Sequence, residues 1–135
     1  HNDCEVLKRS IEAAEILEGF VMIHVGDTFS SLEKLLAMLR PGDIVTHAFH
    51  GRSHGLLDDS DRVREGVREA QRRGVVFDIG HGRGSLSFRT LDKVLSQDFF
   101  PDNISSDLHI NNIEGPVFDQ VTTLSKFLYA GMPLE

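Results

Sequence analysis

The sequence predicts an α/β fold in which parallel strands alternate with helices. Short apolar segments recur along the chain, each is joined to a segment with helical spacing of its apolar residues, and glycine or proline separates the units. Such units connect by right-handed crossovers, which places their strands parallel in one sheet. The strands recur at intervals of about 22 to 32 residues, as βα units do, so we predict a single domain over residues 1–135.

The first unit consists of a helix over residues 4–18 and a strand over residues 20–25. The helix is predicted because Leu7, Ile11 and Ala14 recur at spacings of four and three residues, which places them on one helical face. The strand is predicted from an apolar run that contains a single histidine near its end.

The second and third units follow the same pattern. Ser30 or Ser31 is expected to cap a helix that leads to a strand over residues 43–49. A helix over residues 60–73 then leads to a strand over residues 75–80. Each of these strands is followed by a polar loop that contains glycine.

The last part of the chain adds a fourth strand and a final helix. A helix near residues 89–97 leads to a strand over residues 104–108. The final helix is expected to start at Pro116, because proline is favoured at the first helical position, and to end near Gly131.

Composition limits the classes of function. Hydrophobic residues make up 40% of the chain and charged residues 26%, as in folded domains, and no apolar run approaches the roughly 20 residues of a membrane-spanning helix. We therefore expect no membrane as a partner. The net charge is −7, so a nucleic acid is not expected as a partner either, because phosphate backbones bind basic surfaces. Cys4 is the single cysteine and cannot form an internal disulfide, which favours a reducing cytoplasm.

Reactive side chains cluster where the predicted strands end. Ligands of parallel α/β folds bind at the carboxyl ends of the strands, so side chains at these positions are expected to converge on one rim. The side chains at this rim are His24, His47, His50, His81, Asp107 and His109.

Imidazoles and a carboxylate on one rim suit a divalent metal ion, with zinc as the first choice and manganese, iron or cobalt as alternatives. Such an ion lowers the pKa of a bound water to roughly 7 and polarises a carbonyl group. Asp107 would accept the proton of that water and pass it to a leaving amine or alkoxide. We therefore predict hydrolysis of an amide, a cyclic amide or an ester.

Less specific interpretations stay open. A histidine at a strand end, taken alone, is more often a satisfied polar residue than a ligand, and Asp107 would equally well cap the following turn. The glycine-rich loop 80–85 would hold a phosphate with its backbone amides, although it lacks the spacing of a P-loop. The alternatives are thus a non-catalytic metal- or ligand-binding domain and a domain that binds a phosphorylated ligand at this loop.

The chain contains four segments that together resemble the amidohydrolase/deacetylase branch of the amidohydrolase superfamily, whose members are dihydroorotase-like: MIHVG, GDIVTHAFHG, GVVFDIGHGRGSLSF and PDNISSDLH. The resemblance covers nearly the whole chain. It implies a (β/α)8 barrel of the TIM-barrel type with a one- or two-metal centre, of which this chain holds about strands five to eight. It also implies a deacetylase- or dihydroorotase-like hydrolase with a small-molecule substrate.

The same resemblance assigns roles to individual residues. His24 and His47 match the metal-binding histidines at the ends of strands five and six, and Asp107 matches the strand-eight aspartate that binds metal and shuttles protons. The loop after strand seven is where substrate contacts are expected. The expected substrate-binding residues are Gly80, His81, Gly82, His50, His109 and Asn112.

Two elements that the resemblance implies do not occur in this sequence. They are the His-x-His pair of strand one and the strand-four lysine. A full barrel has about 250 residues, so the chain corresponds to a half-barrel. Half a barrel leaves two open parallel edges, so we expect self-association or pairing with a missing N-terminal half.

Overall fold

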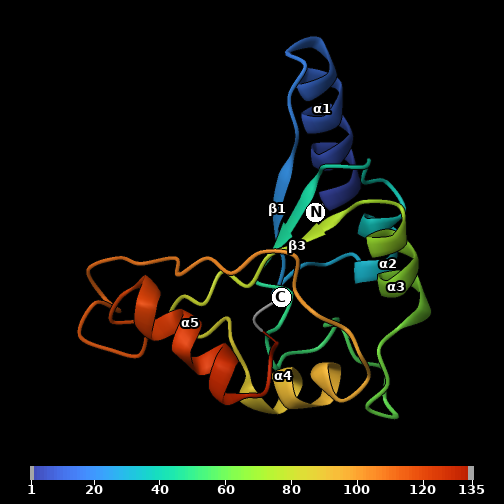
Figure 1. The fold of residues 1–135 in the computed structure, drawn as a ribbon. Coiled ribbons are helices and arrows are strands. Elements are labelled where there is room, and N and C mark those ends of the chain that lie inside the picture. Colours follow the sequence, from blue (N-terminus) through green and yellow to red (C-terminus); the bar gives the residue numbers. More distant parts are fainter. Residues whose placement is uncertain (1, 134–135) are drawn as a thin grey trace.

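The computed structural model describes residues 2–133 and has a three-stranded parallel sheet at its centre (Figure 1). The strands β1 (Met22–His24), β2 (Ile44–Thr46) and β3 (Val76–Phe77) lie in sequence order, with β2 in the middle. The connection after each strand therefore leads to a new strand that lies directly beside the previous one. The predicted α/β class with parallel strands is confirmed.

Five helices surround this sheet in the described part of the chain. Helix α1 stands at the end of the sheet where the strands begin, whereas α4 and α5 lie at the opposite end (Figure 1). No described helix is long and apolar enough to cross a membrane. The helices are α1 (Asp3–Ile16), α2 (Leu32–Leu36), α3 (Glu65–Arg72), α4 (Phe88–Leu95) and α5 (Gln120–Tyr129).

The core lies where the sheet meets α2 and α3. Val45 of β2 and Phe77 of β3 are fully buried, and Phe99 packs edge-on against Phe77 with the ring centroids 5.4 Å apart. Leu36 of α2 and Val67 of α3 join the same cluster, which holds the two helices side by side. Burial of these side chains holds the strands against the two helices, and the parallel pairing places their carboxyl ends at one edge of the sheet.

The predicted fourth strand is an extended segment rather than a full strand of the sheet. Asp78 forms an isolated parallel bridge with Asn103. The amides of Ile79 and His81 donate to the carbonyl groups of Asn103 and Ser105, at 3.1 and 3.0 Å. The segment therefore runs alongside the chain that follows β3, and it ends at the same rim as the strands.

Helix α3 begins later than predicted. The sequence pattern predicted a helix from residue 60, but α3 starts at Glu65. The carboxylate of Asp58 accepts the backbone amides of Ser60 and Arg62, at 2.8 and 3.0 Å, and holds a turn there. Aspartate competes with helix formation through such local bonds, which is why this boundary prediction was wrong.

Helix α5 also begins later than predicted, at Gln120 instead of Pro116. Asp119 is its N-cap, and its carboxylate accepts the amide of Thr122 at 2.6 Å. Pro116 follows a cis peptide bond and lies in the preceding loop. The side chain that satisfies the first free amides therefore decides where this helix starts.

Asp43 ties together the amino ends of β1 and β2. Its fully buried carboxylate accepts the amides of Val21 and Arg40, each at 2.8 Å, and the Arg40 guanidinium at 2.9 Å. Burial alone would raise the pKa of Asp43, but the hydrogen bonds from Arg40 and from the two amides lower it overall. This carboxylate therefore stabilises the end of the sheet that lies away from the predicted rim.

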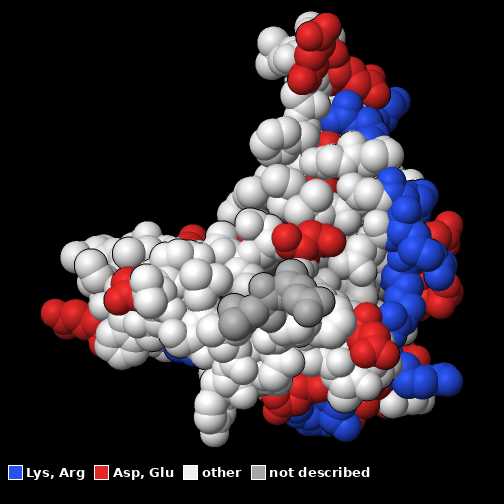
Figure 2. All heavy atoms as spheres, viewed as in Figure 1, with Lys and Arg blue, Asp and Glu red and all other residues white. Residues whose placement is uncertain are grey.

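Charged side chains are unevenly distributed over the surface. Lysine and arginine gather along the flank formed by α2 and α3, with acidic side chains among them (Figure 2). The side formed by α5 is mostly uncharged in the same view. Exposed apolar side chains on this second side include Ile110, Ile113, Phe118, Val121, Leu124, Leu128 and Tyr129.

Candidate metal centre

The first two predicted metal ligands lie in contact with each other. His24 is the last residue of β1, and His47 directly follows β2, so the parallel register brings both to one edge of the sheet. The Nδ1 atom of His24 lies 3.0 Å from the Nε2 atom of His47, and the ring centroids are 4.9 Å apart. His24 is exposed and His47 is half-buried, so this pair is accessible from solvent.

Gly80 determines which nitrogen of His47 is available to a ligand. The Nδ1 atom of His47 lies 2.7 Å from the carbonyl oxygen of Gly80. A carbonyl oxygen only accepts, so Nδ1 must donate its hydrogen, and in the neutral ring Nε2 then carries the lone pair. That nitrogen is the one that faces His24. Metal-binding histidines commonly donate their other N–H to a backbone carbonyl in this way.

The backbone around the rim adopts conformations that are unusual for residues with a side chain. His47 and Asp107 have φ angles of +65° and +48°. Left-handed conformations cost a non-glycine residue about 1–3 kcal/mol and cluster at functional sites. Gly80 and Gly82 are also left-handed, and a Cβ atom at Gly82 would lie 2.7 Å from the Oδ2 atom of Asp107. The two glycines therefore leave the room that the side chains of His47 and Asp107 occupy.

Asp107 lies at the same rim but outside the histidine pair. Its exposed carboxylate lies against Gly82, whereas His47 lies against Gly80 of the same loop. Among residues 2–133, no three histidine, cysteine, aspartate or glutamate side chains form a metal-binding group. The structure thus brings together two of the three predicted ligands and places the third on the adjacent loop.

The histidine pair fits two ligand positions of a metal site. Two nitrogens bound to one tetrahedral zinc ion are about 3.3 Å apart when each bond is about 2.0 Å long. The observed separation of 3.0 Å between the nitrogens of His24 and His47 is close to that value. Imidazole nitrogens also match the donor preference of zinc and of similar divalent ions.

His81 is buried and already bonded through both ring nitrogens. Its Nδ1 atom lies 2.8 Å from the carbonyl oxygen of Gly82, and its Nε2 atom lies 2.8 Å from Nζ of Lys126. The same lysine donates to the carbonyl oxygen of Pro116. Burial lowers the pKa of Lys126, and the nearby Asp119 partly opposes this change. His81 therefore anchors its loop to α5, and its expected contact with substrate stays a prediction.

Asn112 and His109 shape the loop that follows Asp107. The side chain of Asn112 is fully buried, donates to the carbonyl oxygen of Asp107 at 2.8 Å and accepts the amide of His109 at 2.8 Å. The Nδ1 atom of His109 accepts the amide of Asn111. These bonds hold the backbone on which Asp107 stands, and substrate contact by either residue remains a prediction.

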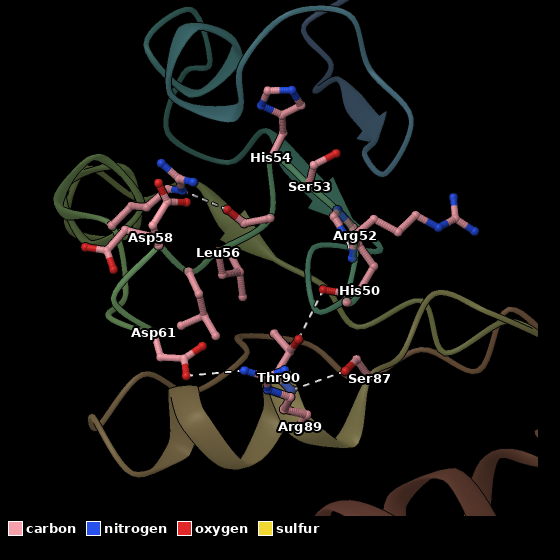
Figure 3. A pocket seen from close by; sticks show the side chains of 15 residues that line it. His50, Arg52, Ser53, His54, Leu56, Asp58, Asp61, Ser87, Arg89 and Thr90 are labelled. Atoms are coloured by element: carbon pink, nitrogen blue, oxygen red, sulfur yellow. Dashed lines mark hydrogen bonds and ion pairs between the residues drawn. The ribbon is translucent and has the colours of Figure 1, made fainter.

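His50 lines a separate cavity of about 390 Å³ between the loop after β2 and α4 (Figure 3). Its side chain is 3% exposed, and its Nδ1 atom accepts the amide of Arg52 at 3.0 Å. In the neutral ring the hydrogen is then on Nε2, which has no partner among the described residues. Burial lowers the pKa of His50, as does the positive charge of Arg52. Other residues around the cavity are Asp58, Asp61, Arg64, Ser87 and Thr90.

Relatives of known name match the chain over about a third of their own length. It is 38% identical over 113 residues to a deacetylase from Enterococcus faecalis, 35% over 129 to one from Brucella anthropi and 38% over 130 to one from Agrobacterium fabrum. These alignments cover 82%, 96% and 96% of the chain, but only 31%, 32% and 32% of the relatives. No family model matches the chain.

Two solved structures are similar to the chain over nearly all of its length. The structure of a dihydroorotase has a TM-score of 0.84 at 37% sequence identity. The match covers 95% of this chain and 35% of the dihydroorotase chain. The structure of an adenine deaminase has a TM-score of 0.88 at 35% sequence identity. The match covers 93% of this chain and 35% of the adenine deaminase chain. The chain belongs to the amidohydrolase superfamily. Its parallel βα units are accordingly part of a TIM-barrel-type fold.

Membership of the amidohydrolase superfamily confirms the resemblance that the four sequence segments indicated. Sequence reasoning missed two residues that the structure places beside the rim. Lys126 was hidden within an ordinary helical pattern, and no feature of the sequence indicated it. Asp78 did leave a signal, because it is a carboxylate inside an apolar strand segment, where a charge is rarely buried without partners.

Proposed function

We propose that this chain supplies part of the metal site of a metallohydrolase that cleaves an amide, a cyclic amide or an ester bond. The observation that carries the proposal is the contact between His24 and His47 at the carboxyl ends of neighbouring parallel strands. In this proposal, β1, β2, β3 and the extended segment that follows Asn103 correspond to barrel strands five to eight.

In the proposed site, His24 and His47 would hold a divalent ion, with zinc as the first choice. A bound ion of this kind supplies Lewis acidity, which polarises a carbonyl group and acidifies water. The exposed carboxylate of Asp107 would take up a proton from water and deliver it to the leaving nitrogen or oxygen. Gly80 would keep His47 in the orientation that turns Nε2 towards the ion.

The deacetylase and dihydroorotase names support a small substrate with an acyl group on nitrogen or oxygen, whereas adenine has no acyl group. Three relatives are called deacetylases, and the two solved structures are a dihydroorotase and an adenine deaminase. Because this chain spans only about a third of each of these proteins, the complete activity and the substrate are part of the proposal.

Metal content tests the first half of the proposal. The purified chain is incubated with Zn²⁺, freed of excess ion and analysed for zinc. We expect the wild type to retain zinc and His47→Ala to lose it. His54→Ala is the matched control, because His54 is an exposed histidine outside the pair. A wild type without zinc would contradict the proposal.

Turnover tests the second half. The zinc-loaded chain is assayed with an N-acetyl amino acid, an acetyl ester and dihydroorotate. We expect hydrolysis of at least one of them above the uncatalysed rate, and loss of that activity in Asp107→Asn. Retained zinc without any turnover would instead support a non-catalytic metal-binding domain.

The loop 80–85 is less favoured as a phosphate site. The amides of Gly80, His81 and Gly82 already donate to the side chain of Ser105 and to the carbonyl groups of Ser105 and Ser106. A phosphate would have to compete with these bonds, because anion-binding loops present free amides.

A further inference from the structure

Asp78 is a buried carboxylate that joins three segments of the chain directly behind the rim. Its side chain is 1% exposed and lies just after β3. The hydroxyl groups of Thr46 and Ser105 donate to its Oδ2 atom, at 2.6 and 2.7 Å, and the side-chain amide of Asn103 donates to its Oδ1 atom. Three donors satisfy a carboxylate that would otherwise be costly to bury.

The partners of Asp78 stand next to the residues of the candidate metal centre. Thr46 immediately precedes His47, and Ser105 lies two positions before Asp107. Asp78 itself lies two positions before Gly80. The carboxylate of Asp78 therefore connects the backbone segments that carry His47, Gly80 and Asp107.

A continuous series of hydrogen bonds leads from Asp78 to the histidine pair. The Ser105 hydroxyl donates to Asp78 and accepts the amide of Gly80 at 3.2 Å. The carbonyl group of Gly80 accepts Nδ1–H of His47, and the Nε2 lone pair of His47 faces Nδ1 of His24 at hydrogen-bond distance. The Ser105 hydroxyl both donates and accepts, whereas the amide and the carbonyl group of Gly80 belong to the two peptide groups on either side of its Cα atom. The backbone of Gly80 therefore links the bond from Ser105 to the bond from His47.

We propose that Asp78 is a positioning residue of the metal centre, acting through Ser105 and Gly80 to hold His47 with Nδ1–H on the carbonyl and the Nε2 lone pair towards the ion. This inference rests on the proposed function, and it adds a residue that touches neither the ion nor the substrate. Removing the acceptor frees the Ser105 hydroxyl to turn, which releases the peptide of Gly80 and then the imidazole.

Metal affinity separates this role from a purely structural one. In Asp78→Asn, one carboxylate oxygen is replaced by an amide group that cannot accept a hydrogen bond, and in Ser105→Ala the series is broken at its second bond. We expect both variants to bind Zn²⁺ at least tenfold more weakly than the wild type, the usual effect of removing a residue that orients a metal ligand. The dissociation constants are measured by competition with a chelating dye.

Asp43→Asn is the matched control. Asp43 is as deeply buried and also ties strands together, but it lies at the amino ends of the strands. We expect this variant to lose thermal stability and yet to keep its zinc affinity within about twofold, once corrected for the folded fraction. Equal weakening in Asp43→Asn, or wild-type affinity in Ser105→Ala, would overturn the positioning role.

A second measurement does not depend on metal. The ring ¹⁵N chemical shifts of His47, recorded at pH 8, report which nitrogen carries the hydrogen. We expect Nδ1–H in the wild type and a mixture of the two tautomers in Ser105→Ala. If the wild type binds no zinc, the proposed function fails, and this measurement, made on both Asp78→Asn and Ser105→Ala, then decides whether Asp78 positions His47. Identical tautomers in wild type and variant would refute it.

Discussion

Gly80 is the residue at which the candidate site is most sensitive to a single methyl group. Its φ angle is +50°, and a Cβ atom there would lie 2.3 Å from Oγ1 of Thr46 and 2.5 Å from Nδ1 of His47. The added atom must displace the histidine or the loop. We expect Gly80→Ala to weaken zinc binding at least tenfold and to lower the free energy of unfolding by about 1–3 kcal/mol. Calorimetric titration and thermal unfolding measure the two effects.

Gly42→Ala provides the control for this substitution. Gly42 is also left-handed, at φ +88°, but a Cβ atom there would meet nothing within 4 Å. The variant therefore carries backbone strain without a collision, and it should lose stability while binding zinc as the wild type does. Zinc affinity that falls equally in the two variants would show that strain, rather than contact with His47, explains the effect.

Asp43 makes stability depend on pH in the acid range. Its pKa is lower in the folded protein than the ordinary value of 3.8, so the unfolded chain binds more protons between the two values. The contribution of Asp43 is thus complete above pH 3.8 and is lost as the pH falls through the lowered value. We expect Asp43→Asn to cost about 1–3 kcal/mol at neutral pH. The difference from wild type should shrink below pH 3.8 in urea unfolding, and a difference that grew there would contradict this assignment.

The histidine pair could be predicted from the sequence, but its hydrogen bonds could not. His24 and His47 lie near the ends of apolar runs, and parallel strands end on the same edge, so the two residues were expected to be near each other. The partner of His47 is a carbonyl group in a glycine loop. Its direction depends on the φ angle of Gly80, which no sequence pattern specifies.

At the scale of secondary-structure elements, α4 illustrates how a single N-cap side chain stabilises a helix. Ser87 is the N-cap, and its hydroxyl accepts the amide of Thr90 at 3.3 Å. We expect Ser87→Ala to lower the free energy of unfolding by about 1 kcal/mol. Ser96→Ala at the other end of α4 removes an exposed hydroxyl that donates to the carbonyl oxygen of Lys93 at 2.8 Å. Because water can replace this exposed bond, we expect the free energy of unfolding to change by less than half as much. Urea unfolding of both variants checks the ranking, and equal losses would contradict the capping role.

Elements with strong periodicity were predictable, and their ends were not. Helix α1 has a regular apolar face, and the structure agrees with its predicted range to within two residues. The starts of α3 and α5 depend on which backbone amides the carboxylates of Asp58 and Asp119 accept. The energy of such a hydrogen bond is similar to the energy gained by adding one more turn to the helix, so the spacing of apolar residues alone cannot locate the first residue of the helix.

The whole molecule presents an open sheet. In the described part of the chain β1 pairs with β2 on one side only, and Met22 and Phe20 are 46% and 64% exposed beside it. Exposed strand edges pair readily with other chains. We expect the chain to associate as its concentration rises, and Met22→Lys to reduce this association by placing a charge on the edge. Sedimentation velocity measures both, and a wild type that stays monomeric at every concentration would contradict the prediction.

The location of His24 on this outermost strand has a consequence for assembly. Any chain that pairs with the free edge of β1 would form backbone hydrogen bonds along Met22–His24, the strand that ends with His24. Pairing with β1 would then reduce the motion of the His24 side chain. A metal ion bound to His24 would in turn reduce the motion of β1, the strand with which the second chain pairs. By thermodynamic reciprocity, each event would favour the other to the same degree. Quaternary structure and cation occupancy would thus behave as one coupled equilibrium rather than as two independent properties.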